Sequence, residues 1–142
     1  MAEPASVGAQ SVLLVEDDAA VAQMYRLRLE MDGYLVLTAV DGETGLSMAE
    51  RFLPDLIILD IGLPGMNGLE LLDTMRARDR VRGIPVLIPT NFEDPEAEKK
   101  GLELGARQFL RKSKTTPDAL TVSVRRSIGG GDAVAYRGST QA

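Results

Sequence analysis

The 142-residue sequence contains no cysteine, no histidine and no tryptophan. Without cysteine, the chain has no disulfide, no thiolate metal ligand and no thiol nucleophile. Without histidine, it has no imidazole general base, no histidine metal ligand and no phosphohistidine of its own. Any chemistry carried out by this chain must therefore depend on carboxylates, hydroxyls, lysine or a hard metal ion.

Long apolar runs and a positive net charge are also absent. No stretch approaches the roughly 18 apolar residues that span a bilayer, and the opening MAEPASVGAQ lacks the basic and apolar regions of a signal peptide. With 21 acidic against 16 basic residues, the net charge is −5, which disfavours binding to nucleic acid through charge alone. We therefore expect a cytoplasmic protein that binds neither membrane nor nucleic acid.

The sequence predicts one folded domain with short polar ends. We interpret residues 1–10 as a polar leader and residues 11–128 as the domain. Residues 129–142 begin with three glycines and are interpreted as a flexible tail. A second domain and internal repeats are not evident.

Short apolar runs alternate with segments of helical periodicity along this domain. We predict strands at residues 12–15, 35–37, 56–59, 86–88 and 108–110. One apolar stripe at helical spacing consists of Val21, Met24, Leu27 and Met31. Helix starts are predicted at Asp94-Pro95 and Thr116-Pro117. Five strands alternating with five helices predict an α/β fold, with a parallel sheet between helical layers.

Acidic side chains follow the predicted strands, at the sheet edge where parallel α/β proteins bind ligands. Glu16, Asp17 and Asp18 follow the first strand, and Asp60 ends the third strand in the stretch LIILDIGLPGMNG. We interpret Asp18 as a helix N-cap because a helical segment follows it. The other carboxylates would repel one another without a cation, and oxygen ligands favour Mg²⁺. The sequence therefore predicts a magnesium site.

A hydroxyl and an ammonium group follow the fourth and fifth predicted strands, at the same edge. They belong to Thr90 and Lys112. Together with a metal-bound carboxylate, these groups suit a phosphoryl group in transfer, because the cations neutralise its oxygens while a carboxylate attacks phosphorus. We therefore expect an aspartyl phosphate as the covalent product.

Four stretches of the sequence, in matching order and separation, resemble the receiver domain of two-component response regulators over about residues 10–128. They are VLLVEDD (12–18), LIILDIGLPGMNG (56–68), PVLIPTN (85–91) and QFLRKS (108–113). The resemblance implies a doubly wound, flavodoxin-like (βα)5 three-layer sandwich with strand order 2-1-3-4-5. It also implies a phosphohistidine donor on a sensor histidine kinase or a histidine phosphotransfer protein.

The resemblance implies a role for individual residues at the predicted metal site. Asp60 matches the phosphoacceptor. Glu16 and Asp17 match the acidic pair that helps to hold Mg²⁺. Gly62 matches the residue whose backbone carbonyl completes that coordination.

The resemblance also implies a conformational switch. Thr90 and Lys112 match the hydroxyl and the lysine that contact the phosphoryl group, and Phe109 matches an aromatic residue that turns inward when the hydroxyl residue moves. The implied output is binding of a downstream effector or a second copy through the fourth helix, fifth strand and fifth helix.

The sequence departs from the family pattern at four positions. Pro89 replaces an aliphatic residue and lacks a backbone N–H, and Asn91 replaces a small residue. Ser113 replaces a proline that follows the lysine through a cis peptide, so we expect a trans peptide or a strained cis peptide. Phe109 lacks the hydroxyl of the more common tyrosine. We expect these changes to alter the switch more than the phosphorylation.

The leading interpretation is a stand-alone receiver that is not an enzyme. A phosphatase of the haloacid dehalogenase type needs a second aspartate two residues after the nucleophile, where this chain has Gly62. A flavin carrier needs a Ser/Thr/Gly-rich phosphate loop where this chain has EDD. A degenerate receiver that acts as a phosphate-independent interaction module remains the main alternative, because of Pro89, Asn91 and Ser113.

Overall fold

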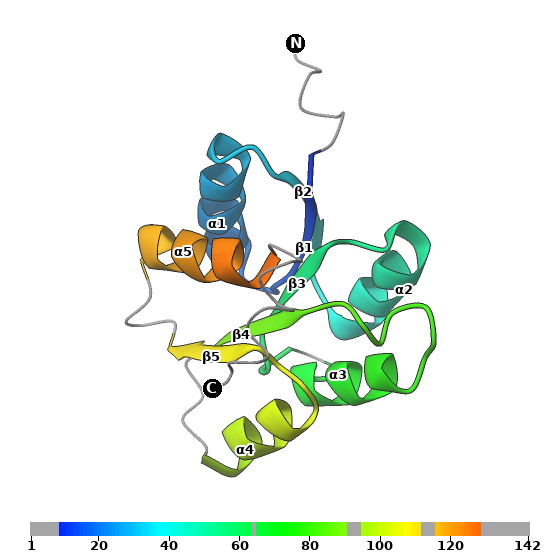
Figure 1. The fold of residues 1–142 in the computed structure, drawn as a ribbon. Helices are drawn as coiled ribbons and strands as arrows, with labels where there is room; N and C mark the ends of the chain where they lie inside the picture. The colour runs from blue at the N-terminus through cyan, green and yellow to red at the C-terminus, as the bar shows by residue number, and fades with distance from the viewer. Residues whose placement is uncertain (1–8, 64, 91–94, 112–115, 129–142) are drawn as a thin grey trace.

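The computed structural model describes residues 9–63, 65–90, 95–111 and 116–128, in which strands and helices alternate (Figure 1). The elements are β1 (Ser11–Val15), α1 (Ala19–Met31), β2 (Leu35–Ala39), α2 (Gly42–Phe52), β3 (Leu56–Leu59), α3 (Gly68–Arg76), β4 (Val86–Thr90), α4 (Pro95–Glu103), β5 (Gln108–Arg111) and α5 (Pro117–Ile128). Among these described residues, no helix has the length and apolar character needed to span a bilayer.

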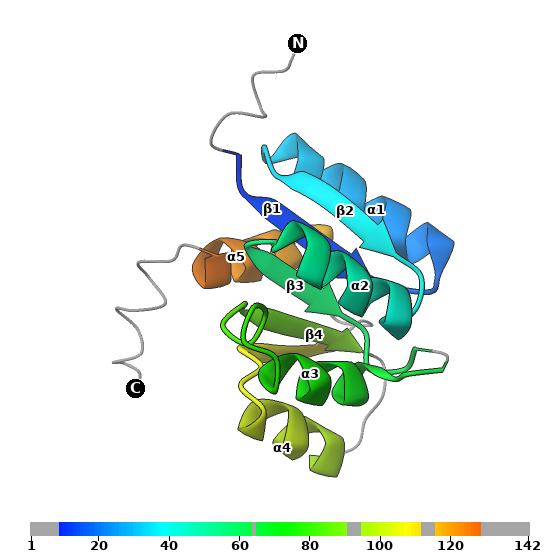
Figure 2. The ribbon, with the colours of Figure 1, turned by 90° about the vertical axis from the view of Figure 1, so that its right-hand side faces the viewer.

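The five strands form one parallel sheet in the order β2-β1-β3-β4-β5. Helices α1 and α5 cover one face, and α2, α3 and α4 cover the other (Figure 1). The flavodoxin-like sandwich predicted from the sequence is therefore confirmed. The carboxyl ends of β1 to β4 point to the same side of the molecule (Figure 2), because the strands are parallel.

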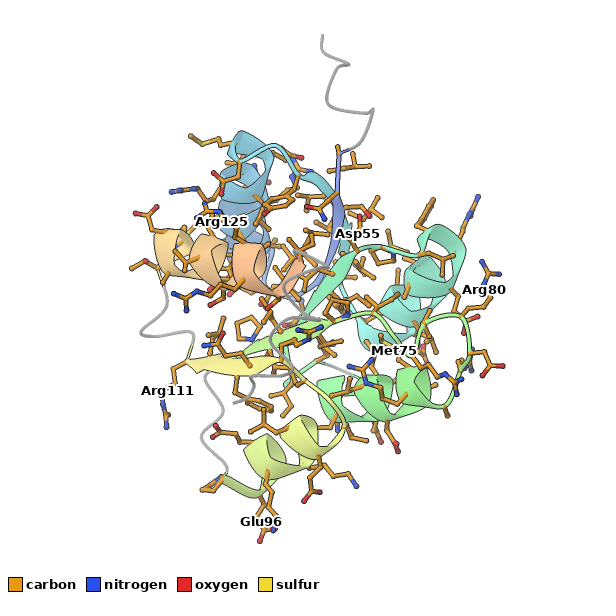
Figure 3. The ribbon with its side chains drawn as sticks, in the orientation of Figure 1. Asp55, Met75, Arg80, Glu96, Arg111 and Arg125 are labelled. Atoms are coloured by element: carbon orange, nitrogen blue, oxygen red, sulfur yellow. The ribbon has the colours of Figure 1, made fainter. Side chains whose placement is uncertain are left out.

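Side chains of alternate strand residues pack into two apolar cores, one on each face of the sheet. In β1, Val12 and Leu14 face α1 and α5, whereas Leu13 and Val15 face the other three helices. In Figure 3 Met75 of α3 lies between its helix and the sheet, and it is fully buried. Because both faces are covered, β3 and residues 12–15 of β1 are continuous buried apolar runs, whereas the edge strands β2 and β5 carry exposed residues.

The apolar stripe of α1 predicted the helix correctly but not its buried face. Tyr25 and Leu29 are the residues that α1 buries against the sheet and α5. Of the predicted stripe, Val21 packs partly against this core, whereas Met24, Leu27 and Met31 are exposed by 43%, 47% and 81%. The sequence misleads here because α1 carries apolar residues on both faces at helical spacing, and only the tertiary packing selects between them.

The predicted helix starts are confirmed where the structure describes them. Pro95 and Pro117 are the first residues of α4 and α5, positions where the missing proline N–H has no helical partner to lose. The hydroxyl of Thr116 accepts a hydrogen bond from the N–H of Ala119 at 3.0 Å. Asp94 lies outside the described residues.

β4 continues through Pro89 to Thr90, beyond the predicted strand. The carbonyl of Pro85 accepts a hydrogen bond from the N–H of Ile57 in β3, and the carbonyl of Val86 accepts one from the N–H of Arg107 beside β5. Backbone groups of successive strand residues point alternately to the two neighbouring strands, so those of Pro89 point toward β3. Proline has no N–H to donate there. Accordingly, β4 pairs with β3 at Val86 and Leu87, while its pairing with β5 continues to Thr90.

Candidate functional site

Three of the carboxylates predicted from the sequence converge at the carboxyl edge of the sheet. Glu16, Asp17 and Asp60 each place one carboxylate oxygen within 4.8 Å of the others. Glu16 is exposed by only 2% and Asp60 by 7%, while Asp17 is exposed. The cluster therefore has two buried acids and one acid that faces solvent.

The sheet itself positions the two buried acids. Glu16 directly follows β1, and its N–H donates to the carbonyl of Ala39, the last residue of β2, at 2.9 Å. Asp60 directly follows β3, and its N–H donates to the carbonyl of Val15, the last residue of β1, at 3.1 Å. Both acids thus extend the hydrogen bonding of the sheet by one residue, which fixes their backbones.

Local backbone N–H groups orient the carboxylates. The N–H of Asp18 donates to Glu16 Oε2 at 3.1 Å, and the N–H of Gly62 donates to Asp60 Oδ1 at 3.1 Å. Hydrogen bonds accepted by a carboxylate are shorter and stronger than those between neutral groups. Glu16 and Asp60 are therefore held as acceptors in the places where a cation would bind.

Asp18 does not belong to this cluster. Its Oδ1 accepts hydrogen bonds from the N–H groups of Ala20 and Val21 at 3.0 and 3.1 Å, which caps α1. The three consecutive acids of the sequence thus separate into two cluster members and one helix cap, and the interpretation of Asp18 as an N-cap is confirmed.

Two glycines allow the loop after Asp60 to pack closely. A β-carbon on Gly68, the first residue of α3, would lie 2.5 Å from the carbonyl oxygen of Asp60 and 2.6 Å from Ile61 Cα. A β-carbon on Gly42 would lie 2.4 Å from the carbonyl oxygen of Met66. Since both contacts are with backbone, these positions require glycine.

The clustered acids were predicted from the sequence, but this role of Gly68 was not. At the start of α3, Asn67 forms a capping box with Glu70. The close approach of Gly68 to Asp60 depends on how α3 returns to the sheet, and that return has no local sequence signal.

The remaining predicted residues are only partly described. Thr90 is the last residue of β4 and pairs with Arg111 in the sheet, so its backbone lies at the same edge as Asp60. Lys112, Asn91 and Ser113 lie outside the described residues. The ring of Phe109 is partly buried against the core beneath α2, α3 and α4.

The three clustered carboxylates fit a hard divalent cation. They supply oxygen ligands without nitrogen or sulfur donors, which favours Mg²⁺ over the softer metals. A cation also offsets the repulsion among three negative groups whose ligand atoms lie within 4.8 Å. Glu16, Asp17 and Asp60 are therefore the residues that would hold such an ion.

Comparisons with known proteins agree with this geometry. Residues 12–125 match the family model of the response regulator receiver domain. Over 101 residues, which are 71% of this chain, the sequence is 37% identical to the DNA-binding dual master transcriptional regulator RpaA of Synechocystis and 39% identical to the response regulator PleD of Caulobacter vibrioides. These alignments cover 42% of RpaA and 22% of PleD, so the chain spans less than half of either relative.

A solved structure resembles most of this chain. The chemotaxis protein CheY4 of Vibrio cholerae superimposes with a TM-score of 0.78 and is 32% identical. The match covers 84% of this chain and 99% of CheY4. With its sheet order, its acidic cluster and these similarities, the chain belongs to the receiver-domain family of response regulators.

Proposed function

We propose that Asp60 accepts a phosphoryl group from a phosphohistidine on a donor protein, in a reaction that needs Mg²⁺. The main support is the convergence of Asp60 with Glu16 and Asp17 at the end of the sheet, in a chain of the receiver family. In this proposal the chain itself is a switch, and its phosphorylation changes which surface binds a partner.

In the proposed transfer step, Asp60 is the nucleophile. A carboxylate oxygen of Asp60 attacks phosphorus and forms an O–P bond, while the P–N bond to the donor imidazole breaks. The electron pair of that bond leaves with the imidazole nitrogen. Later attack of water on phosphorus releases inorganic phosphate and restores the carboxylate. Burial of Asp60 and its bond from Gly62 hold the attacking group in one orientation.

Charge on the transferred group must be neutralised by its surroundings. When bound, Mg²⁺ would supply positive charge to the phosphoryl oxygens. We propose that the ammonium group of Lys112 contributes a second cation and the hydroxyl of Thr90 a hydrogen bond. The carbonyl of Gly62 is proposed as a further oxygen ligand. The position of Thr90 at the end of β4, two strands from β1, supports this arrangement.

A protein donor would need a surface beside the acidic edge. α1 begins at that edge, where Asp18 caps it, and exposes Met24, Leu27 and Met31 along its length. Exposed apolar side chains in a row are typical of protein docking surfaces. We propose that the phosphodonor protein docks along this side of α1.

The output surface is proposed to consist of α4, β5 and α5. β5 is an edge strand, and it carries Phe109 and leads toward Lys112. Leu102 of α4 and Val122 of α5 are exposed apolar residues on these elements. Binding of a partner protein or a second copy to this surface would therefore depend on the positions of Phe109 and β5.

The proposal is tested with a small phosphodonor, so that no cognate kinase is needed. Wild-type protein and Asp60→Asn are incubated with phosphoramidate, with and without Mg²⁺, and their intact masses are measured. We expect about 80 Da to be added to wild type in the presence of Mg²⁺, the mass of one phosphoryl group. We expect no addition without Mg²⁺ or on Asp60→Asn.

A wild-type protein that stays unmodified under these conditions would instead favour a receiver that acts without phosphate. An equal adduct on Asp60→Asn would place the acceptor at another carboxylate.

A further inference from the structure

The ring of Phe109 and helix α4 meet at Gly101. Gly101 is buried in α4, and Phe109 is partly buried in β5. A β-carbon built on Gly101 would lie 2.4 Å from Phe109 Cε1 and 2.6 Å from Phe109 Cζ. Since non-bonded carbon atoms prefer about 3.5–4.0 Å, the ring occupies the space that any side chain at position 101 would need.

Ile88 of the sheet lies next to the contact between Gly101 and Phe109. Ile88 lies beside Phe109 in the register of β4 and β5 and is fully buried. Its Cδ1 would lie 3.5 Å from the same β-carbon, an ordinary contact distance. The steric clash is thus with the outer edge of one aromatic ring. Either the ring or α4 must move if a side chain is added at position 101.

The far end of α4 is held in place by Arg76 of α3. The Nε of Arg76 donates to the carbonyl of Leu104 at 2.6 Å, and its Nη2 donates to that of Gly105 at 3.2 Å. These carbonyls directly follow α4, which ends at Glu103. Glu96 is at the opposite end of the helix and is exposed (Figure 3). The C-terminal end of α4 is therefore anchored, so a displacement of α4 would move the residues that precede this end.

We propose that Gly101 is a positioning residue whose missing side chain lets α4 and the ring of Phe109 share one space, so that the position of the ring determines where α4 lies. The distances at Gly101 support this contact whether or not Asp60 accepts a phosphoryl group. Its use in signalling rests on the proposed function, because Phe109 lies on the strand that leads to Lys112 and α4 belongs to the proposed output surface.

The contact is tested with Gly101→Ala and the matched control Gly83→Ala. A β-carbon on Gly83 meets no atom within 4 Å. The chain contains 3 phenylalanines, so ring-labelled phenylalanine gives few NMR signals, and Phe109→Ala identifies those of Phe109. We expect the Phe109 ring signals to shift toward those of free phenylalanine in Gly101→Ala. The other phenylalanine signals, and all signals in Gly83→Ala, should stay in place.

Thermal unfolding separates this contact from a general effect on the helix. Alanine is the better helix former, so Gly101→Ala should raise Tm when the ring is absent, in the Phe109→Ala background. In the background with the ring we expect Tm to fall, by about 2–8 °C. If Gly101→Ala alone does not fold, the double variant should fold, which also supports the contact. Unchanged Phe109 ring signals, or an equal change in Tm in both backgrounds, would overturn the proposal.

The link to signalling is measured separately, with Mg²⁺ and phosphoramidate. We expect wild type and Gly101→Ala to gain the same mass, while the backbone amide signals of α4 shift in wild type and shift less in Gly101→Ala. Equal shifts in both proteins would overturn the regulatory part of the proposal. If neither protein gains mass, the proposed function fails, and the ring signals and Tm values still decide whether Gly101 and Phe109 share one space.

Discussion

The Oδ1 atom of Asp60 accepts a hydrogen bond from the backbone N–H of Gly62 at 3.1 Å, two residues further along the chain. The carboxylate is therefore oriented by the loop that follows it, and that loop is packed against α3 through Gly68. The geometry of the candidate phosphoacceptor thus depends on a residue eight positions away.

Gly68→Ala tests this dependence. The added methyl group would meet the backbone of Asp60 and Ile61 at 2.5 and 2.6 Å, and backbone atoms cannot rotate away. We expect a loss of stability of about 1–3 kcal/mol, typical of overpacking. We also expect phosphorylation by phosphoramidate to slow by roughly tenfold to a hundredfold, because the nucleophile is displaced. Gly83→Ala is the control, with a change within about 0.5 kcal/mol. Equal rates for wild type and Gly68→Ala would contradict this account of the loop.

Asp17→Asn tests the metal site, with Asp18→Asn as the matched control. Asp17 supplies one of three clustered carboxylates, so removing its charge should weaken Mg²⁺ binding by about tenfold or more, since affinity follows the charge of the ligand set. Asp18 caps α1, and asparagine is an equally good cap. Calorimetric titration with Mg²⁺ measures both variants. Comparable losses in the two variants would show that the binding responds to general acidity and not to this cluster.

Arg76→Met tests the anchor between α3, α4 and the loop that joins α3 to β4. The guanidinium donates to the carbonyls of Leu104, Arg82, Ile84 and Gly105. Methionine leaves these acceptors without that partner, so we expect unfolding to become easier by on the order of 3 kcal/mol. Arg80 is exposed at the edge of the molecule (Figure 3), and Arg80→Met should change stability by less than about 0.5 kcal/mol. Denaturant unfolding measures the free energy of unfolding of both variants. Equal values for Arg76→Met and Arg80→Met would contradict a stabilising role for the hydrogen bonds of Arg76.

The cap of α2 gives a prediction for pH. The carboxylate of Asp41 accepts from the N–H of Thr44 at 2.7 Å, and this hydrogen bond lowers the pKa of Asp41 below its usual value. A lowered pKa in the folded state means that the charged cap stabilises the protein above the unfolded pKa of about 3.9. That stabilisation is lost as the pH falls through the lower, folded value.

Asp41→Asn retains an acceptor but does not titrate. We therefore expect the difference in Tm between wild type and Asp41→Asn to be constant above about pH 5 and to change in favour of the variant as the pH falls below about 4. A difference that is independent of pH across this window would show that the charge of Asp41 does not contribute to folding.

Much of the fold could be predicted because its signals are local. The apolar run at residues 56–59 and the helix start signal Thr116-Pro117 each depend only on neighbouring residues. The strand and the helix that they predict are both confirmed. The buried face of α1 could not be predicted, because Tyr25 and Leu27 are both apolar and only contact with the sheet and α5 separates them.

The acids of the site were predictable for a similar reason, since Glu16 and Asp60 directly follow apolar strands in a parallel sheet. The close contacts at Gly68 and Gly101 were not, because each forms only when a helix packs back against the sheet. The roles of Thr90, Lys112 and the carbonyl of Gly62 stay predictions from the sequence and its family resemblance.

The most direct test of the central claim locates the phosphoryl group on the chain. Borohydride reduces an aspartyl phosphate to homoserine, so protein treated with phosphoramidate and Mg²⁺ can be reduced, digested and sequenced by tandem mass spectrometry. Our account predicts homoserine at position 60 and at no other acid, and none when Mg²⁺ is withheld. Homoserine at another acidic position, or its absence from wild type in the presence of Mg²⁺, would contradict the account.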